Sequence, residues 1–183
     1  MARFEVVGHK WGDISEQNYG VAILNDCKYG YNAKDQTIKL SLLKSGKHPD
    51  TEADMGEHDF TYSLLPHAHG PVEGGVIEES EIVNLPLKTV CGQSVLDEKD
   101  LFLIEGEGVH IDAVKKAEDQ DALILRLHEY RGGTHKIRIS SSFPIKSYQE
   151  ANLLEEAIGP SVSENTIFRT VHPFEIVNYI IKF

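Results

Sequence analysis

The 183-residue sequence contains only two cysteines, Cys27 and Cys91. Two thiols are too few for the disulfide framework of a small secreted domain or for a pair of CxxC metal motifs. No specific signal points to a single disulfide either, so a reduced compartment fits best and we expect a cytoplasmic protein. We also expect Cys27 to be a buried structural residue, although the neighbouring Lys28 could lower its thiol pKa.

The sequence also lacks long apolar runs and an excess of basic residues. No run approaches the roughly 18 apolar residues that a membrane-spanning helix needs. The 18 Lys and Arg residues are outnumbered by 29 Asp and Glu residues, which gives a formal net charge of −11. Such a surface repels phosphate backbones and anionic lipid headgroups. We therefore expect neither a nucleic-acid partner nor a membrane partner.

Apolar residues recur at every second position over much of the chain. The pattern is clearest at residues 4–8, 38–42, 60–64, 109–113, 123–127 and 137–139. Side chains alternate between the two faces of a strand, so this period predicts half-buried strands. Clusters of Gly, Asn and Asp separate the runs at short intervals, as in sandwiches and barrels. We predict an all-β fold, an antiparallel β-sandwich of roughly ten to twelve strands in two packed sheets.

Three segments interrupt this pattern. Residues 149–157 are the one stretch that permits a helix, and they are too short and too poorly capped to organise a domain. Residues 47–59 predict a long polar loop, and residues 85–100 predict a connection over the surface. Neither loop has the composition of a domain linker, and no repeat of fixed period occurs. We therefore expect residues 1–183 to form a single domain.

Histidines and carboxylates are concentrated in one stretch of the chain. The members of this cluster are His48, Asp50, Asp54, His58, His67 and His69. On a strand, His67 and His69 would share a face, as in the metal sites of cupin barrels. Pro66 and Gly70 flank the pair, however, and place it at a strand end or in a turn. A cupin-like metal enzyme is one alternative, but we expect no metal ion in this chain.

Motifs for other chemistries are absent. The sequence has no G-x-S-x-G nucleophile elbow, no P-loop and no dinucleotide-binding fingerprint. Glycoside hydrolysis needs a pair of carboxylates, and among 29 acidic residues no pair stands out. We therefore predict no catalytic residue from spacing.

Aromatic residues lie near polar corners in the first part of the chain. Trp11, Tyr19, Tyr29 and Tyr31 are close in sequence to carboxylates and amides. This combination is typical of sugar-binding surfaces, because a ring can stack on the apolar face of a sugar. The same rings can also be core residues whose polar ends reach water, and we favour that interpretation. An independent carbohydrate-binding sandwich remains an alternative function.

Several short motifs follow one another along the chain. They are His9-Lys-Trp11, Asp13-Ile-Ser-Glu16, the run from Tyr19 to Gly30, Leu40-Ser-Leu-Leu-Lys44, Phe60-Thr-Tyr62, Val114-Lys-Lys-Ala-Glu118, Leu125-Arg-Leu-His-Glu129, Asn152-Leu-Leu-Glu-Glu156 and Pro173-Phe-Glu-Ile176. Together they resemble the C-terminal β-domain of glycoside hydrolase family 38 α-mannosidases. The cytosolic and bacterial branch of that family is the most similar.

The resemblance implies a C-terminal fragment of a larger glycosidase, in which the β-region follows an α/β catalytic barrel and a helical bundle. The parent would be a retaining α-mannosidase that hydrolyses terminal α-mannosyl linkages in mannose-containing oligosaccharides. Its aspartate nucleophile and its zinc ion would belong to the catalytic domain. The family motifs that supply them do not occur in this sequence. We therefore expect the isolated chain to be inactive.

In such an enzyme the β-region would pack against its own catalytic domain and lend loop residues to the rim of the sugar pocket. We expect the corner at residues 13–18 and the turn at residues 25–29 to face the catalytic domain or the substrate. The candidate rim or interface residues are Trp11, Asp13, Ser15, Glu16, Asn25, Asp26, Lys28 and Tyr29. An apolar face uncovered by excision would also favour a homo-oligomer.

Overall fold

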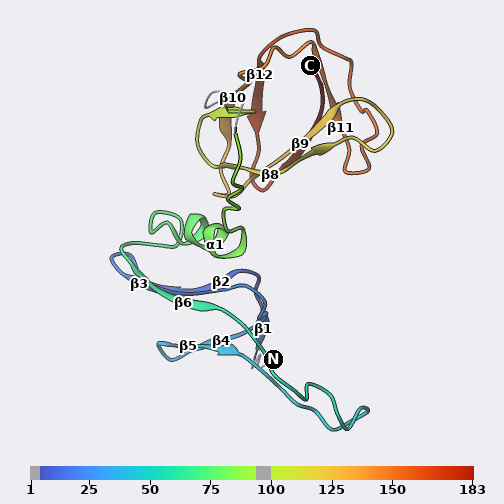
Figure 1. Ribbon diagram of the computed structural model, residues 1–183. Helices are drawn as coiled ribbons and strands as arrows, with labels where there is room; N and C mark the ends of the chain where they lie inside the picture. The colour runs from blue at the N-terminus through green and yellow to red at the C-terminus, as the bar shows by residue number, and fades with distance from the viewer. Residues whose placement is uncertain (1–4, 94–99) are drawn as a thin grey trace. The chain divides into compact units, whose positions relative to one another are not determined.

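The computed structural model describes residues 5–93 and 100–183, so Phe4 of the first apolar run lies outside the described residues. The chain forms two compact units, Met1–Cys91 and Gly92–Phe183 (Figure 1). The described residues contain thirteen antiparallel strands in four sheets and one helix. The predicted all-β class is confirmed, with more strands and sheets than expected. The single domain over residues 1–183 stays a prediction, because two compact units can still fold cooperatively.

Unit 1 contains two three-stranded sheets and the helix. The first sheet has the order β2-β3-β6, with β2 at Trp11–Ser15, β3 at Gly20–Asn25 and β6 at Tyr62–His67. The second sheet has the order β1-β4-β5, with β1 at Val6–Val7, β4 at Gly30–Lys34 and β5 at Thr37–Ser41. Helix α1, Val76–Asn84, contacts β2 and β3. Within unit 1, α1 and the β1-β4-β5 sheet lie on either side of the β2-β3-β6 sheet (Figure 1).

Strand β3 is buried because side chains cover both of its faces. On one face, Ala22 and Leu24 pack with Val76 of α1, and Trp11 lies partly buried against them. On the other side of the sheet, Tyr31 of β4 lies against Gly12 of β2, where a Cβ atom would come within 2.5 Å of its ring. The glycine therefore lets the two sheets approach closely.

Unit 2 is a sandwich of two antiparallel sheets. One has the order β11-β13-β9-β8, with β8 at Val109–Lys116, β9 at Leu123–Glu129, β11 at Ser147–Ala151 and β13 at Ile176–Lys182. The other has the order β12-β10-β7, with β7 at Leu103–Glu105, β10 at His135–Ser140 and β12 at Ile167–Val171. Leu125 and Leu127 of β9 pack with Ile137 and Ile139 of β10 in the core between the sheets. The predicted strands at 123–127 and 137–139 are confirmed, although Ile124 on the other face of β9 is also buried, in a second cluster.

The expectation about helix was wrong. Residues 149–157 begin in strand β11, which pairs with β13 from Ser147↔Lys182 to Ala151↔Asn178. Pairing with a neighbouring strand outweighs local helix propensity there. The helix of the structure, α1, lies where none was predicted. Its start carries no sequence signal, because the residue before it, Gly75, is in the left-handed conformation and supplies no side-chain cap. This helix is not long and apolar enough to cross a membrane, and the described residues contain no other.

A buried carboxylate fixes one end of unit 2. Glu129, the last residue of β9, is fully buried. Its oxygens accept hydrogen bonds of 2.8–3.1 Å from the backbone N–H groups of Arg131, Gly132, Gly133 and Phe174. Burial alone would raise the pKa of this carboxyl group, but the four N–H donors hold the pKa below its ordinary value. Glu129 therefore ties the turn after β9 to the connection between β12 and β13.

We expect Glu129→Gln to lower the free energy of unfolding by about 2–5 kcal/mol, because its NH2 group would face backbone donors. The folded-state pKa lies below the unfolded value of about 4.3, so the wild-type carboxylate stabilises the fold above about pH 5 and loses this effect as pH falls. Urea unfolding at several pH values between about 7 and 3 measures both effects, and the variant should lose less stability on acidification.

Glu107→Gln provides the matched control for this change. Glu107 is exposed and makes an ion pair with Arg131, so its replacement should alter the free energy of unfolding by less than about 1 kcal/mol. Equal losses in the two variants would contradict the role of Glu129.

Candidate functional site

Asp13 lies on β2 with its carboxylate against His67 at the end of β6. The Asp13 Oδ1 atom is 2.8 Å from His67 Nε2, and the two side chains are 6% and 2% exposed. Gly20 and Gly74 leave room for the imidazole, since a Cβ atom at either position would come within 2.3 Å of it. The pair is therefore enclosed, and it holds β2 and β6 in place across β3.

The histidine cluster does not converge. The expected strand-end position of the His-x-His pair is confirmed, since His67 closes β6 and His69 lies in the turn after it. His69 Nδ1 lies 3.1 Å from the carbonyl oxygen of Gln17, and His58 Nε2 lies 2.9 Å from that of Asp54. In the part of the chain that the structure describes, no three His, Cys, Asp or Glu residues could hold a metal ion together. The zinc ion of the family resemblance does not fit these residues.

Asn25 closes β3 and organises the turn after it. Its Oδ1 atom accepts hydrogen bonds from the backbone N–H groups of Cys27 at 3.1 Å and Lys28 at 2.6 Å. Its Nδ2 atom donates to the hydroxyl of Tyr31, and Asn84 of α1 donates to its backbone carbonyl at 3.0 Å. Asn25 is only 1% exposed, so its side-chain amide cannot reach a ligand at the surface. Its role is to hold the backbone of the turn from inside unit 1.

Asp26 and Cys27 are exposed at the tip of this turn. Both carboxylate oxygens of Asp26 accept from the backbone N–H of Thr61, at 3.1 and 3.2 Å. A hydrogen bond from the Cys27 thiol lowers the pKa of Asp26, and the same bond raises the pKa of the thiol despite the nearby Lys28. The expectation of a buried Cys27 was wrong, because the turn directs this side chain away from the core.

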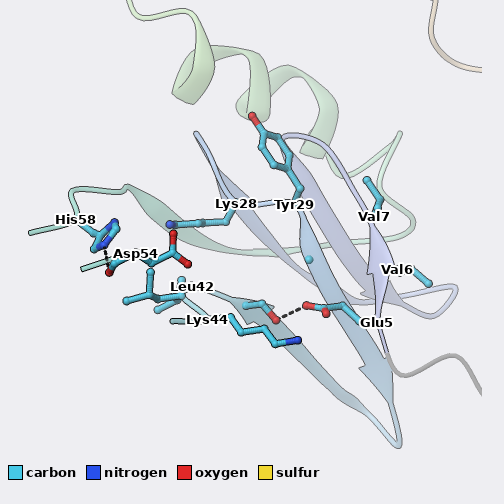
Figure 2. Close-up of a pocket in the computed structure, with 12 residues that line it drawn as sticks. Glu5, Val6, Val7, Lys28, Tyr29, Leu42, Lys44, Asp54 and His58 are labelled. Carbon is cyan, nitrogen blue, oxygen red and sulfur yellow. Dashed lines mark hydrogen bonds between the residues drawn. The ribbon is translucent and has the colours of Figure 1, made fainter. Parts of the chain in front are cut away.

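Lys28 and Tyr29 line a surface pocket of about 700 Å³ (Figure 2). Its other walls include Glu5, Val6, Ser41, Lys44, Asp54 and His58. The Lys28 Nζ atom lies 4.9 Å from the centre of the Phe60 ring, and the Tyr29 ring centre lies 4.8 Å from that of His9. The pocket therefore combines cations and carboxylates with one half-exposed aromatic ring.

Ser15 and Glu16 line a second hollow, of about 570 Å³, at the end of the β2–β3 hairpin. Its other lining residues are Ile14, Tyr19, Val21, Gln36 and Ile38. The predicted residues are thus distributed over the surface and interior of unit 1 and do not form one site. Residue spacing could not distinguish the exposed members of this set from the buried ones. The partners that bury Asp13 and Asn25 come from distant strands and from α1.

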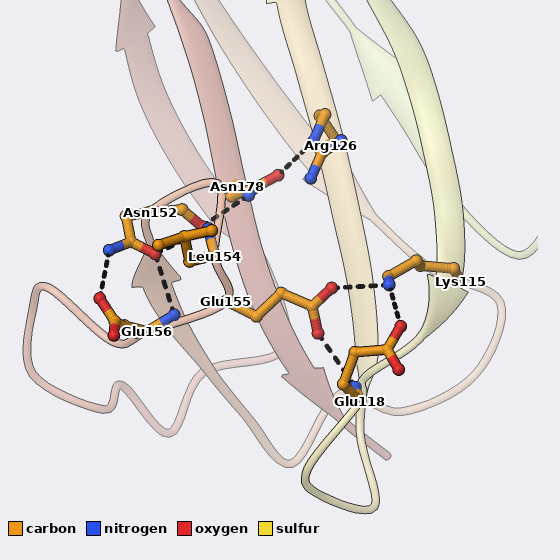
Figure 3. Close-up of polar contacts among 8 residues, drawn as sticks. All are labelled: Lys115, Glu118, Arg126, Asn152, Leu154, Glu155, Glu156 and Asn178. Atoms are coloured by element: carbon orange, nitrogen blue, oxygen red, sulfur yellow. Dashed lines mark hydrogen bonds and ion pairs between the residues drawn. The ribbon is translucent and has the colours of Figure 1, made fainter.

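A polar cluster on unit 2 was not predicted as a site (Figure 3). The Lys115 Nζ atom lies 2.6 Å from Glu118 Oε1 and 2.8 Å from Glu155 Oε1. The hydrogen bond to Glu118 is the main cause that raises the pKa of Lys115, and the bond from Lys115 lowers that of Glu155. The Glu118 backbone N–H also donates to Glu155, at 3.0 Å. These contacts fasten the loop after β11 to the end of β8.

Asn152 and Asn178 continue this cluster. The Asn178 amide accepts from Arg126 Nε at 3.0 Å and donates to the Asn152 carbonyl at 2.8 Å. The Asn152 side chain accepts from the backbone N–H groups of Leu154 and Glu156 at 2.9 and 3.0 Å. The fold thereby brings together motifs at residues 114–118, 125–129 and 152–156. Their shared presence in the sequence was the one signal for this cluster.

Two models of one enzyme family match the chain. The glycosyl hydrolases family 38 C-terminal domain matches residues 1–52, and the family 38 C-terminal beta sandwich domain matches residues 108–179. The chain belongs to glycosyl hydrolase family 38. The matched segments contain the corner and turn of unit 1 and the polar cluster of unit 2, so the resemblance seen in the motifs is confirmed.

Curated relatives of this family 38 chain are similar along nearly its whole length. Alpha-mannosidase G of Dictyostelium discoideum is 40% identical over 97% of the chain, and alpha-mannosidase 2C1 of Homo sapiens is 35% identical over 98%. An alpha-mannosidase of Saccharomyces cerevisiae is 30% identical over 100%. The chain spans only 17%, 18% and 19% of the length of these relatives, respectively.

Solved structures share the fold of the family 38 chain. An alpha-mannosidase from Enterococcus faecalis V583 superposes with a TM-score of 0.75 over 96% of this chain and 21% of that chain, at 20% identity. A glycosyl hydrolase family 38 protein from the same species also gives a TM-score of 0.75, over 96% of this chain and 22% of that chain, at 19% identity. These structures support the β-sandwich architecture.

We expect Asp13→Ala to lower the free energy of unfolding by about 1–3 kcal/mol, because it leaves the buried His67 ring without its partner. Asp13→Asn, which retains a side-chain oxygen, should lose less. Asp26→Ala, at an exposed turn, should lose less stability than Asp13→Ala. Urea unfolding of the three variants gives the order, and a larger loss for Asp26→Ala than for Asp13→Ala would contradict the assignment.

Proposed function

We propose that this chain is the C-terminal β region of a retaining α-mannosidase that hydrolyses terminal α-mannosyl linkages. The observation that carries the proposal is the identity of 30–40% to proteins named alpha-mannosidases over at least 97% of the chain. The two family 38 models support it, because they match the chain in both units.

In this proposal the bond-breaking chemistry belongs to the rest of the protein. The aspartate nucleophile and the zinc ion lie in a catalytic domain outside these residues, and the chain alone is inactive. The two matching family models support this division, because both describe C-terminal domains of family 38 enzymes.

The chain contributes by packing on its catalytic domain and by lining the rim of the sugar pocket. The members of the predicted set that reach the surface are Ser15, Glu16, Asp26 and Tyr29, with Lys28 half-buried beside them. These five residues are our rim or interface candidates. The other three, Trp11, Asp13 and Asn25, support the corner and the turn from inside unit 1.

Location and assembly belong to the same proposal. Both cysteines are free thiols, which suits a cytoplasmic enzyme. Apolar side chains on unit 2, such as Leu154 at 79% exposure and Phe174 at 72%, would be covered by the catalytic domain or in a homo-oligomer. An independent carbohydrate-binding module is the second candidate, and the two hollows of unit 1 favour it.

The full-length protein should hydrolyse an aryl α-mannoside, with aryl α-glucoside and aryl β-mannoside as specificity controls. The 183-residue chain should give no turnover of any of them. Turnover by the chain alone would overturn the division of labour. A full-length protein that is folded and supplied with zinc but inactive on the α-mannoside would overturn the proposed activity.

Lys28→Ala in the full-length protein should lower kcat/KM on an oligomannoside by about tenfold, equivalent to about 1.4 kcal/mol of transition-state stabilisation. The melting temperature should change by less than about 2 °C, because the Lys28 side chain is not part of a core. Lys39→Ala is the control, because Lys39 is exposed on β5 and lines neither hollow. A fall in stability without a fall in kcat/KM would make Lys28 a folding residue.

A further inference from the structure

The hollow at the end of the β2–β3 hairpin has an apolar floor. Ile14 and Val21 pair directly across β2 and β3, and Ile38 of β5 adds a third half-buried side chain. The volume of about 570 Å³ lies within the range of about 300–1,000 Å³ that is usual for small-molecule sites. The floor offers contact with a ligand that has an apolar face.

The rim of the hollow combines one aromatic ring with planar polar groups. Tyr19 is 55% exposed, and its backbone is fixed because its carbonyl accepts the Glu16 N–H at 2.8 Å. No described residue forms a hydrogen bond with the Glu16 carboxylate or the Gln36 amide, so both groups are available to a ligand. A carboxylate and an amide can each bond adjacent hydroxyl groups.

Gln36 occupies a backbone position that does not favour it. Asp35 and Gln36, in the turn between β4 and β5, have φ angles of 50° and 59°. Glycine and asparagine suit such left-handed positions, whereas glutamine is strained there. A glutamine at this turn is therefore better explained by its side chain than by the turn itself.

The composition of the hollow favours a neutral sugar over a charged ligand. It contains no Lys or Arg, and Glu16 is the one acidic residue in its lining. The pocket around Lys28 differs, because it carries several charges and its Tyr29 ring already contacts His9. The exposed Tyr19 ring has room to stack on a pyranose.

We propose that this hollow binds an α-mannosyl residue of a glycan, with Tyr19 stacked on the apolar face of the sugar. The Glu16 carboxylate accepts hydrogen bonds from the sugar hydroxyl groups, and the Gln36 amide both accepts and donates. Ile14, Val21 and Ile38 contact the edge of the sugar. The choice of mannose rests on the proposed function. The hollow would raise the affinity of the enzyme for glycans that present more than one mannosyl residue.

Titration of the isotopically labelled 183-residue chain with methyl α-mannoside, followed by NMR, tests the site directly. We expect saturable shifts of the Tyr19 and Gln36 amides with a dissociation constant of about 1–10 mM. Tyr19→Ala should weaken binding at least tenfold. Tyr62→Ala is the matched control, since Tyr62 is 54% exposed on β6 and lies outside the hollow.

Gln36→Gly separates binding from folding. Glycine adopts the left-handed conformation without strain, so this variant should unfold at the same or a higher urea concentration and still lose at least tenfold in affinity. Absence of saturable shifts, or unchanged affinity in both Tyr19→Ala and Gln36→Gly, would overturn the proposal. Loss of binding in Tyr29→Ala with retention in Tyr19→Ala would overturn it too, by assigning the sugar to the other pocket.

The titration requires no turnover, so its outcome is separable from that of the aryl α-mannoside assay. Hydrolysis by the full-length protein without sugar binding at the hollow removes the site and leaves the enzyme proposal intact. If the chain binds the sugar but the full-length protein does not hydrolyse the α-mannoside, the enzyme proposal fails and the chain is a carbohydrate-binding module.

Discussion

Buried polar side chains must find hydrogen-bond partners, and this requirement shapes both units. In unit 1 the partners of Asn25 are backbone groups of its own turn, a tyrosine of β4 and an asparagine of α1. In unit 2 the carboxylate of Glu129 takes four backbone N–H groups from two connections. Each side chain replaces hydrogen bonds that the backbone cannot make with itself at a turn. The turn that carries Lys28 and Tyr29 keeps its shape for this reason.

The sequence predicted strands well where one face is buried and the other is wet. Strand β10 shows this alternation, with Ile137 and Ile139 buried between exposed Lys136 and Arg138, and the predicted run at 137–139 lies within it. Strand β13 was missed because five consecutive residues, from Val177 to Ile181, are buried, so no alternation is visible. Helix α1 was missed because it has neither a capping side chain nor a basic last turn. Burial on both faces and weak caps hide an element from pattern reasoning.

The sequence predicted which polar residues gather at the corner and the turn, but not which of them are exposed. The corner and the turn are where polar side chains gather, but their exposure depends on partners far away in the chain. Asp13 is enclosed by His67, which follows 54 positions later, and no local spacing could reveal that pair. Gln36, in the turn before β5, lines the second hollow because β5 contacts β2, and sequence spacing does not reveal that contact. Family motifs such as those around Glu129 and Asn152 describe how turns are held, so they identify the fold better than they identify chemistry.

The bond between Asn84 and Asn25 has a mechanical consequence. It joins the last turn of α1 to the residue whose amide also holds the backbone of Lys28. Any displacement of the helix along β3 must therefore either break this partly buried hydrogen bond or move the turn that carries Lys28 and Tyr29. A neighbouring domain that shifted α1 without breaking this bond would therefore move the turn, and with it two walls of a pocket that the domain need not touch.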